Sequence, residues 1–363
     1  MKSTTTRRAL ILLPHDLPGG AERVTMTVAE AALRSGIFGE VVVFVQSRGD
    51  NGTMKHIQDH PNARVVFAKS ERQRGGLGPL LKICSSGRYD FTFSSFLELN
   101  AIACLFRRIG ILKTSRLVTR ESTTIFERNF GWKTPFIRNL YRLYGSQDLI
   151  VCQTNRMADS LKLNVDNRLH SMMRTIPNPV SYSLEQNLSS TEVVGRAYRQ
   201  NRIVWCGRIS HVKSPRRAIE TLAALHKLGH DEARLLVIGD GPMMADTRDF
   251  ASSIGVGSRI EFTGFLADPM SIMRTCQAGL VTSDVEGYPN VIVEMLCSGV
   301  AGVASTNCAG DLDEIPGVLV ATEPTPGALA EALSNILSKG APPKNIGEFL
   351  KGRNPGSFLQ QLF

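Results

Sequence analysis

The chain has 363 residues, which exceeds one ordinary core and favours two domains of about 150 to 200 residues each with a cleft between them. Hydrophobic residues make up 42% and charged residues 21%, a composition that excludes extensive disorder. The net charge of +9 is unevenly divided: residues 1–180 hold 26 lysines and arginines against 14 acids, or +12, and residues 181–363 hold 16 against 19, or −3. A phosphate-bearing partner or a generally basic surface would both account for the basic first half.

The first half alternates short apolar strands with helices. A strand is expected at "RRALILLP", followed by a glycine loop and by "GGAERVTMTVAEAALRSG", whose apolar residues recur at helical spacing. Further strands are expected at "EVVVFV", "NARVVFA", "YDFTFSSF", "SRLVTRES" and "DLIVCQT". This order indicates a parallel sheet covered by helices on both faces.

The second half repeats this alternation after a proline-flanked segment. The prolines of "TIPNPV" favour an extended chain, so residues 177–180 are expected to join two domains. Strands then follow at "RIVWCGRI", "ARLLVIGDGP", "RIEFTGF", "AGLVTSD" and "AGVAST". We therefore predict Rossmann-like domains at 1–178 and 179–340, with 341–363 as a tail that is the candidate for a return to the first domain.

Loops at the carboxyl ends of parallel strands are where such folds bind ligands. Gly19 and Gly20 lie between the first strand and its helix, where free amides and the helix dipole favour an anion, although a tight turn alone would also use them. Arg208 and Lys213 follow the first strand of the second domain and can converge on a pyrophosphate; two solvated charges are the alternative.

Two glutamates mark the segment "SDVEGYPNVIVEML". Pro289 suits the first helical position, so Glu286 is expected in the loop before the helix and Glu294 on its second turn, where both can face one cleft. Amides near Asn290 and Val291 would meet an anion or sugar hydroxyls, and Glu294 would accept hydrogen bonds from a ribose. A salt-bridged structural role is disfavoured because no cation lies nearby in the sequence.

The ordered set "GGAERV", "TIPNPV", "GRISHVKS", "VIGDGP", "EFTGF" and "EGYPNVIVEML" resembles the retaining glycosyltransferases of family 4 over almost the whole chain. That resemblance implies an α/β fold of the GT-B class, with two facing Rossmann-like domains, mostly parallel sheets and an inter-domain cleft. It also implies a nucleotide-sugar donor, with a UDP-linked hexose or N-acetylhexosamine as the first expectation. The acceptor would be a lipid-linked or polysaccharide chain in cell-surface glycan synthesis.

The resemblance assigns a role to each matching residue. Arg208 and Lys213 would hold the diphosphate, and Glu286 with the amides after it would hold the transferred sugar. Gly19 and Gly20 would border the acceptor and the diphosphate, and Glu294 would bind the ribose. The complete set expected to bind the donor, beside the catalytic Arg208, Lys213 and Glu286, is Gly19, Gly20, Gly207, Gly241, Gly287, Tyr288, Pro289, Asn290, Val291 and Glu294.

Some features depart from the family pattern. Many relatives carry a histidine where "LVTRESTTIFERN" offers Arg120 and Glu121, which leaves the sugar contact of the first domain open. Asp311 and Asp313 spell D-x-D, a metal-binding pattern in other glycosyltransferases, but a helix start would favour acids there by its dipole alone. We expect no metal and no cofactor.

Other functions are less consistent with these residues. A nucleotide-sugar 2-epimerase of similar fold, or a non-catalytic nucleotide-sugar-binding protein, remains the alternative, and product analysis distinguishes them. A nucleic-acid partner is not expected because no zinc pattern or arginine-rich arm appears. No apolar run near the N-terminus is long enough to span a bilayer, so we expect a cytoplasmic protein. Residues 105–116 are the candidate for peripheral contact with the anionic inner face of the cytoplasmic membrane. A solvated basic helix end is equally consistent with this segment.

Overall fold

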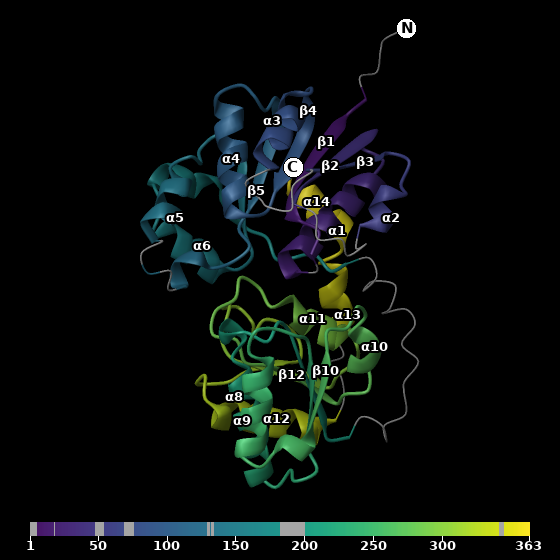
Figure 1. The fold of residues 1–363 in the computed structure, drawn as a ribbon, viewed down its shortest axis with the longest axis vertical. Coiled ribbons are helices and arrows are strands. Elements are labelled where there is room, and N and C mark those ends of the chain that lie inside the picture. The colour runs from purple at the N-terminus through teal and green to yellow at the C-terminus, as the bar shows by residue number, and fades with distance from the viewer. Residues whose placement is uncertain are drawn as a thin grey trace. The chain divides into compact units, whose positions relative to one another are not determined.

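The computed structural model of the chain describes residues 6–17, 19–47, 54–68, 76–128, 131, 134–181, 200–340 and 345–363. It divides into two compact units: 1–182 with 353–363 form the N-terminal unit, and 183–352 form the C-terminal unit. Each unit is built around one open sheet (Figure 1). The division falls at residue 182 where the sequence favoured 178, and the expected tail is split between the units.

The N-terminal unit contains a seven-stranded parallel sheet in the order β3-β2-β1-β4-β5-β6-β7. Its strands are β1 (Arg8–His15), β2 (Glu40–Ser47), β3 (Ala63–Phe67), β4 (Tyr89–Ser94), β5 (Thr114–Arg120), β6 (Leu149–Cys152) and β7 (Met173–Thr175). Its helices are α1 (Gly20–Arg34), α2 (Lys55–Gln58), α3 (Leu77–Ser85), α4 (Leu97–Arg108), α5 (Thr134–Tyr141), α6 (Asn155–Lys162) and α14 (Pro355–Gln361).

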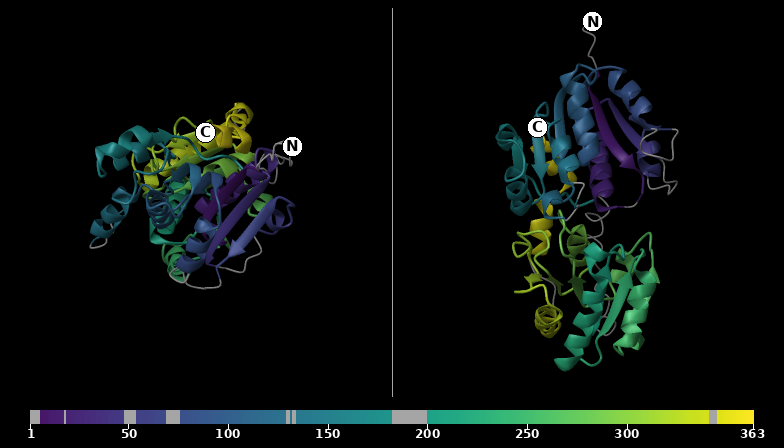
Figure 2. Two further views of the ribbon diagram at one scale, coloured as in Figure 1. Left: turned by 90° about the horizontal axis from the view of Figure 1, so that it is seen from above. Right: turned by 60° about the vertical axis from the view of Figure 1, so that its left-hand side comes forward.

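Both faces of this sheet are buried, which explains the unbroken apolar run of β1. Leu10 and Leu12 point into one core cluster, whereas Ile11 and Leu13 point into the cluster that also holds residues of α1. Alternate side chains of a strand face opposite sides, so a sheet covered twice needs apolar residues at every position. Helices flank the strands of this unit on both sides (right-hand view of Figure 2).

The last residues of the chain belong to the N-terminal unit. Phe358, Leu359 and Leu362 are buried in the same cluster as α1, and the ring centroid of Phe363 lies 5.0 Å from that of Phe91. The carbonyl oxygen of Arg353 accepts a hydrogen bond from the amide of Val180 at 2.9 Å. Three apolar side chains of α14 and the residue after it are thus removed from water, which ties this segment to the first sheet.

The C-terminal unit contains a six-stranded parallel sheet in the order β10-β9-β8-β11-β12-β13. Its strands are β8 (Arg202–Cys206), β9 (Arg234–Ile238), β10 (Ile260–Gly264), β11 (Ala278–Val281), β12 (Gly302–Ser305) and β13 (Val318–Val320). Its helices are α8 (Pro215–Lys227), α9 (Met244–Ser253), α10 (Met270–Met273), α11 (Asn290–Cys297), α12 (Pro326–Lys339) and α13 (Ile346–Lys351). None of the helices in the described ranges is long and apolar enough to cross a membrane.

Each strand order reverses direction once. In the N-terminal sheet the reversal lies between β1 and β4, and in the C-terminal sheet it lies between β8 and β11. Loops that leave two such neighbours at their carboxyl ends diverge and open a crevice, the usual ligand site of doubly wound sheets. The loops after β1, β8 and β11 carry the residues singled out from the sequence.

Candidate active site

The loop after β8 brings Lys213 back over the end of its own strand. A Cβ built on Gly207 would lie 3.6 Å from Lys213 Cε, so the lysine stem runs along the backbone at this glycine. Gly239, after β9, has a φ of +132°, and a side chain there would collide with the carbonyl oxygen of Gly207. Two glycines therefore allow the close approach of loop and strand that positions Lys213.

A buried threonine connects this loop to β11. Thr282 Oγ1 accepts a hydrogen bond from the indole nitrogen of Trp205 at 2.8 Å and donates to the carbonyl oxygen of Lys213, also at 2.8 Å. Its accessible surface is 0%. Because buried polar groups are costly to leave unpaired, this arrangement fixes the backbone at Lys213 against the neighbouring strand.

An aspartate and an arginine reinforce the connection. Asp284 accepts hydrogen bonds from Ser214 Oγ at 2.9 Å and from Arg217 Nη1 at 2.8 Å, and its amide donates to the carbonyl of Val212 at 2.9 Å. Ser214 has a left-handed φ of 47°, an uncommon conformation for a residue other than glycine. Sequence reasoning missed this set, although an arginine in the first turn of α8, where the dipole disfavours cations, was an available signal.

Lys213 and Glu286 form an ion pair between Nζ and Oε1. Their side chains are 25% and 12% exposed, and the backbone amide of Glu286 donates to the carbonyl of Cys308 at 2.8 Å. Glu286 therefore has a cationic partner although none lies nearby in the sequence: the partner comes from a loop 73 positions earlier, which the sheet brings alongside. Two of the three predicted catalytic residues therefore meet directly.

The helix after Glu286 begins one residue later than expected. Pro289 is the residue before α11, and Glu294 lies on the second turn of that helix, 8% exposed. The amide of Asn290 donates to the carbonyl of Tyr288 at 3.0 Å. That amide is therefore used within the turn, which differs from the expectation that it meets a sugar. Gly287 and Pro289 lie in the loop before α11, and Val291 lies in its first turn.

The remaining predicted residues of the C-terminal unit differ in exposure. Arg208 is exposed, at the start of the loop that Lys213 ends. A side chain at Gly241 would collide with the carbonyl oxygen of Ile209, so the loop after β9 packs tightly against the loop after β8. Gly241 thus contacts the loop that carries Arg208, and Arg208 and Lys213 are the cations that the described loop offers to an anion.

The D-x-D pattern does not begin a helix. Asp311 lies in irregular backbone with a φ of 55°, and Asp313 is exposed in a turn. The expectation of a helix start there is wrong. Over the described ranges, no three His, Cys, Asp or Glu side chains gather in a way that could hold a metal ion.

In the N-terminal unit a buried acid, Glu22, lies against Gly19 in the loop before α1. Gly19 precedes α1, and a side chain at Gly19 would collide with the carboxylate of Glu22, which folds back over it. Glu22 is 6% exposed and pairs with His15 Nε2 at 3.3 Å. Burial raises the pKa of the Glu22 carboxyl, opposed by its backbone hydrogen bond and by the charges of His15 and Arg120. Gly20 is exposed at the first position of the helix.

Arg120 and Glu121 are both buried, at 1% and 3% exposure. Arg120 donates to Ser95 Oγ at 2.7 Å and to Asn178 Oδ1 at 2.6 Å. Burial lowers the pKa of its guanidinium, whereas the negative charges of Glu121 and Glu22 raise it. The guanidinium is thus surrounded by protein groups and holds the ends of β4 and β5 against Asn178.

Glu121 lies on the opposite side of the sheet. Its carboxylate accepts hydrogen bonds from the hydroxyls of Tyr141 at 2.8 Å and Tyr144 at 3.0 Å. Burial raises the pKa of Glu121, and the two tyrosine hydrogen bonds oppose that change. In the described structure, both residues that replace the usual histidine support the carboxyl edge of the sheet from within the protein.

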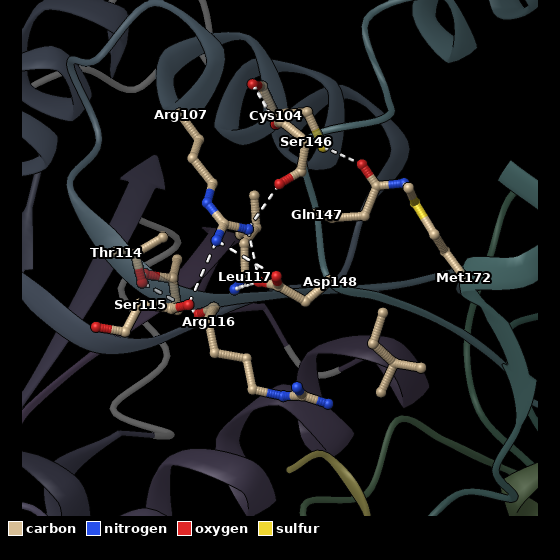
Figure 3. Close-up of polar contacts among 12 residues, drawn as sticks. Cys104, Arg107, Thr114, Ser115, Arg116, Leu117, Ser146, Gln147, Asp148 and Met172 are labelled. Carbon is tan, nitrogen blue, oxygen red and sulfur yellow. Dashed lines mark hydrogen bonds and ion pairs between the residues drawn. The ribbon is translucent and has the colours of Figure 1, made fainter. Parts of the chain in front are cut away.

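The basic segment 105–116 lies at the opposite, amino edge of this sheet. Arg107 donates hydrogen bonds from Nη1 to Asp148 Oδ2 at 2.5 Å and to the carbonyl of Ser146 at 2.6 Å (Figure 3). The Asp148 carboxylate also accepts the amide of Leu117 at 2.7 Å. Arg107 therefore serves the fold. Arg108 also donates, to the carbonyls of Leu143 at 2.8 Å and Tyr144 at 2.7 Å, but it remains exposed, as do Ile109 and Lys113, and these three residues could meet a surface.

The sequence is similar to known glycosyltransferases. Residues 200–339 match the family described as "Glycosyl transferases group 1". The chain is 25% identical over 330 residues to the GalNAc-alpha-(1->4)-GalNAc-alpha-(1->3)-diNAcBac-PP-undecaprenol alpha-1,4-N-acetyl-D-galactosaminyltransferase of Campylobacter jejuni, covering 88% of this chain and 86% of that protein. It is 32% identical over 145 residues to the 2-deoxystreptamine glucosyltransferase of Streptomyces kanamyceticus, which is 39% of this chain and 37% of that protein.

The fold has close counterparts among solved structures. The crystal structure of Anabaena HepE in complex with UDP and glucose aligns with a TM-score of 0.75 at 17% identity, over 98% of both chains. Two open, parallel, Rossmann-like sheets and these matches define the chain as a glycosyltransferase of the GT-B fold. Its residues 200–339 match the group 1 glycosyltransferases, and over most of its length the chain is similar to an enzyme that transfers N-acetylgalactosamine.

Proposed function

We propose that the chain transfers a sugar, with retention of anomeric configuration, from a UDP-linked hexose or N-acetylhexosamine to a lipid-linked or polysaccharide acceptor. The observation that carries the proposal is the convergence of Lys213 and Glu286 where the strand order of the C-terminal sheet reverses. A cation for a diphosphate and a carboxylate for sugar hydroxyls stand together there. The names of the Campylobacter and Anabaena proteins support the lipid-linked acceptor and UDP.

The proposed mechanism relies on electrostatic stabilisation. Arg208 and Lys213 would bind the diphosphate and stabilise the negative charge that grows on it as the bond to the sugar breaks. Glu286 would accept hydrogen bonds from the sugar, and Glu294 from the ribose. The departing phosphate would take the proton of the acceptor hydroxyl on the face where the new bond forms, which retains the anomeric configuration.

A donor screen tests this proposal. UDP-, GDP- and ADP-linked sugars would be compared by thermal shift, and the best would be incubated with a polyprenyl-diphosphate-linked acceptor. We expect a UDP sugar to give the largest shift and NMR of the product to show the anomeric configuration of the donor. An inverted linkage would contradict retention, a free epimerised nucleotide sugar would indicate the epimerase, and binding without any product would indicate a binding protein.

We also propose that transfer needs no metal ion. The cations Arg208 and Lys213 supply the positive charge that a divalent metal contributes in other phosphate chemistry. Incubation with excess EDTA followed by its removal is expected to leave the initial rate within about twofold of the untreated enzyme, because protein cations are untouched. Loss of activity that manganese restores would contradict this prediction.

A peripheral membrane contact through Arg108, Ile109 and Lys113 is a further part of the proposal. Two exposed cations flank an isoleucine that is 58% exposed, a combination suited to acidic headgroups. We expect the protein to sediment with liposomes that contain acidic phospholipid and to stay in the supernatant with neutral ones. Sedimentation that is indifferent to lipid charge would remove this contact from the proposal.

A further inference from the structure

The proposed donor site contains an internal ion pair that a donor would have to rearrange. Lys213 and Glu286 are paired in the structure, yet the proposed function gives them different ligands: the diphosphate for the lysine and the sugar for the glutamate. We propose that Glu286 is a specificity-determining residue, which exchanges Lys213 for sugar hydroxyls and thereby makes the site favour the intact donor over the nucleoside diphosphate product. This inference rests on the proposed function.

The backbone around the pair is held on both sides, so the exchange involves side chains. Thr282 and Asp284 fix the loop of Lys213, as described above. The amide of Glu286 donates to the carbonyl of Cys308, which follows β12. A lysine side chain, with four rotatable bonds, can turn toward a phosphate while its backbone stays in place.

The unfavourable free energy of the exchange arises at the Glu286 carboxylate. Its side chain is only 12% exposed, so water cannot fully replace the ammonium when Lys213 turns away. A partly buried carboxylate that loses its charged partner is destabilised unless other donors take its place. The hydroxyls of a transferred sugar are such donors, whereas a nucleoside diphosphate without a sugar brings none.

The exchange would make the site bind the sugar nucleotide and the nucleoside diphosphate with different affinities. Both ligands offer a diphosphate to Lys213, but only the sugar nucleotide offers Glu286 hydroxyl donors in exchange for the ammonium of Lys213. A residue can favour one ligand over another only by the difference in its interactions with the two. Glu286 would therefore weaken the retention of the product after transfer and leave the donor unaffected.

The test compares UDP with UDP-N-acetylgalactosamine by isothermal titration calorimetry on the full chain. Glu286→Gln keeps the size of the side chain and removes the charge that holds Lys213. We expect this variant to bind UDP about three- to tenfold more tightly than the wild type, and the sugar nucleotide no more tightly than the wild type. Unchanged or weaker UDP binding would overturn the inference.

Two controls separate the exchange from a general loss of negative charge. Asp246→Asn removes an exposed charge of the same unit that is paired with Arg216, and it should leave UDP affinity within about twofold. In a Lys213→Met background, Glu286→Gln should no longer tighten UDP binding, because the lysine that it frees is absent. An equal gain in either control would also overturn the inference.

The same titrations distinguish the two levels of proposal. A wild type that binds and transfers from a UDP sugar, with no gain in the Glu286→Gln variant, would refute the exchange and leave the proposed function standing. A wild type that binds neither UDP nor any UDP sugar would refute the UDP-dependent function and the exchange together.

Discussion

Arg208→Ala is expected to lower kcat by about 100- to 1,000-fold while leaving the melting temperature unchanged. Arg208 is exposed at the start of the loop after β8, so its removal opens no cavity and leaves no buried partner. The proposed loss is in the transition state, where negative charge on the diphosphate is greatest. The KM for the donor should therefore rise less than kcat falls.

Initial rates at saturating acceptor, together with thermal unfolding of each variant, measure this effect. Arg216→Ala is a matched control: Arg216 is also an exposed arginine of the C-terminal unit, but it pairs with Asp246 on α9. We expect its kcat to stay within about twofold of the wild type, as for most surface substitutions. A wild-type rate in Arg208→Ala, or an equal loss in Arg216→Ala, would contradict a specific role of Arg208 in transfer.

Much of the fold could be predicted because the strands are buried on both faces. The runs "RRALILLP" and "EVVVFV" contain apolar residues at successive positions, and this pattern with intervening helices is typical of a doubly wound sheet. The sequence also placed Glu286 and Glu294 correctly before and on α11. Local patterns of spacing and turn residues are sufficient for such predictions, because neighbouring residues determine them.

Contacts between distant segments could not be predicted in the same way. The pairing of Lys213 with Glu286 depends on β8 and β11 being neighbours, which residue spacing does not reveal. Glu22 lies in the first turn of α1, where an acid is ordinary, but its burial beside His15 depends on a residue of β1 that helical spacing does not reveal. In both cases the tertiary partner decides the environment of the charge.

The proline segment 177–180 also contains a tertiary contact that the sequence did not predict. The prolines predicted an extended connection between two domains and no further role for its residues. In the structure Asn178 is 3% exposed. Its side-chain Nδ2 donates a hydrogen bond to Gln153 Oε1 at 3.0 Å, and its Oδ1 accepts one from the guanidinium of Arg120. A residue in the predicted connection is thus an anchor for the carboxyl edge of the first sheet.

Arg120→Met is expected to destabilise the N-terminal unit by about 3 to 5 kcal/mol, the usual cost of removing one partner from a buried charged network. Methionine occupies a similar volume but leaves Ser95 and Asn178 without the donors that they now receive. It also removes the positive charge near Glu22, whose carboxylate is buried. The ends of β4 and β5 would then lose their connection to residue 178.

Hydrogen–deuterium exchange locates this effect, because the two units report separately. Peptides from β1, β4 and β5 should exchange faster in Arg120→Met, while peptides from β8 and β9 keep the wild-type rate. Arg88→Met, at an exposed arginine of the same unit, is the control and should change neither set. Equal protection of β5 in Arg120→Met and the wild type would show that packing alone maintains this edge, and that the buried guanidinium is not needed to hold the loops of the first domain in place.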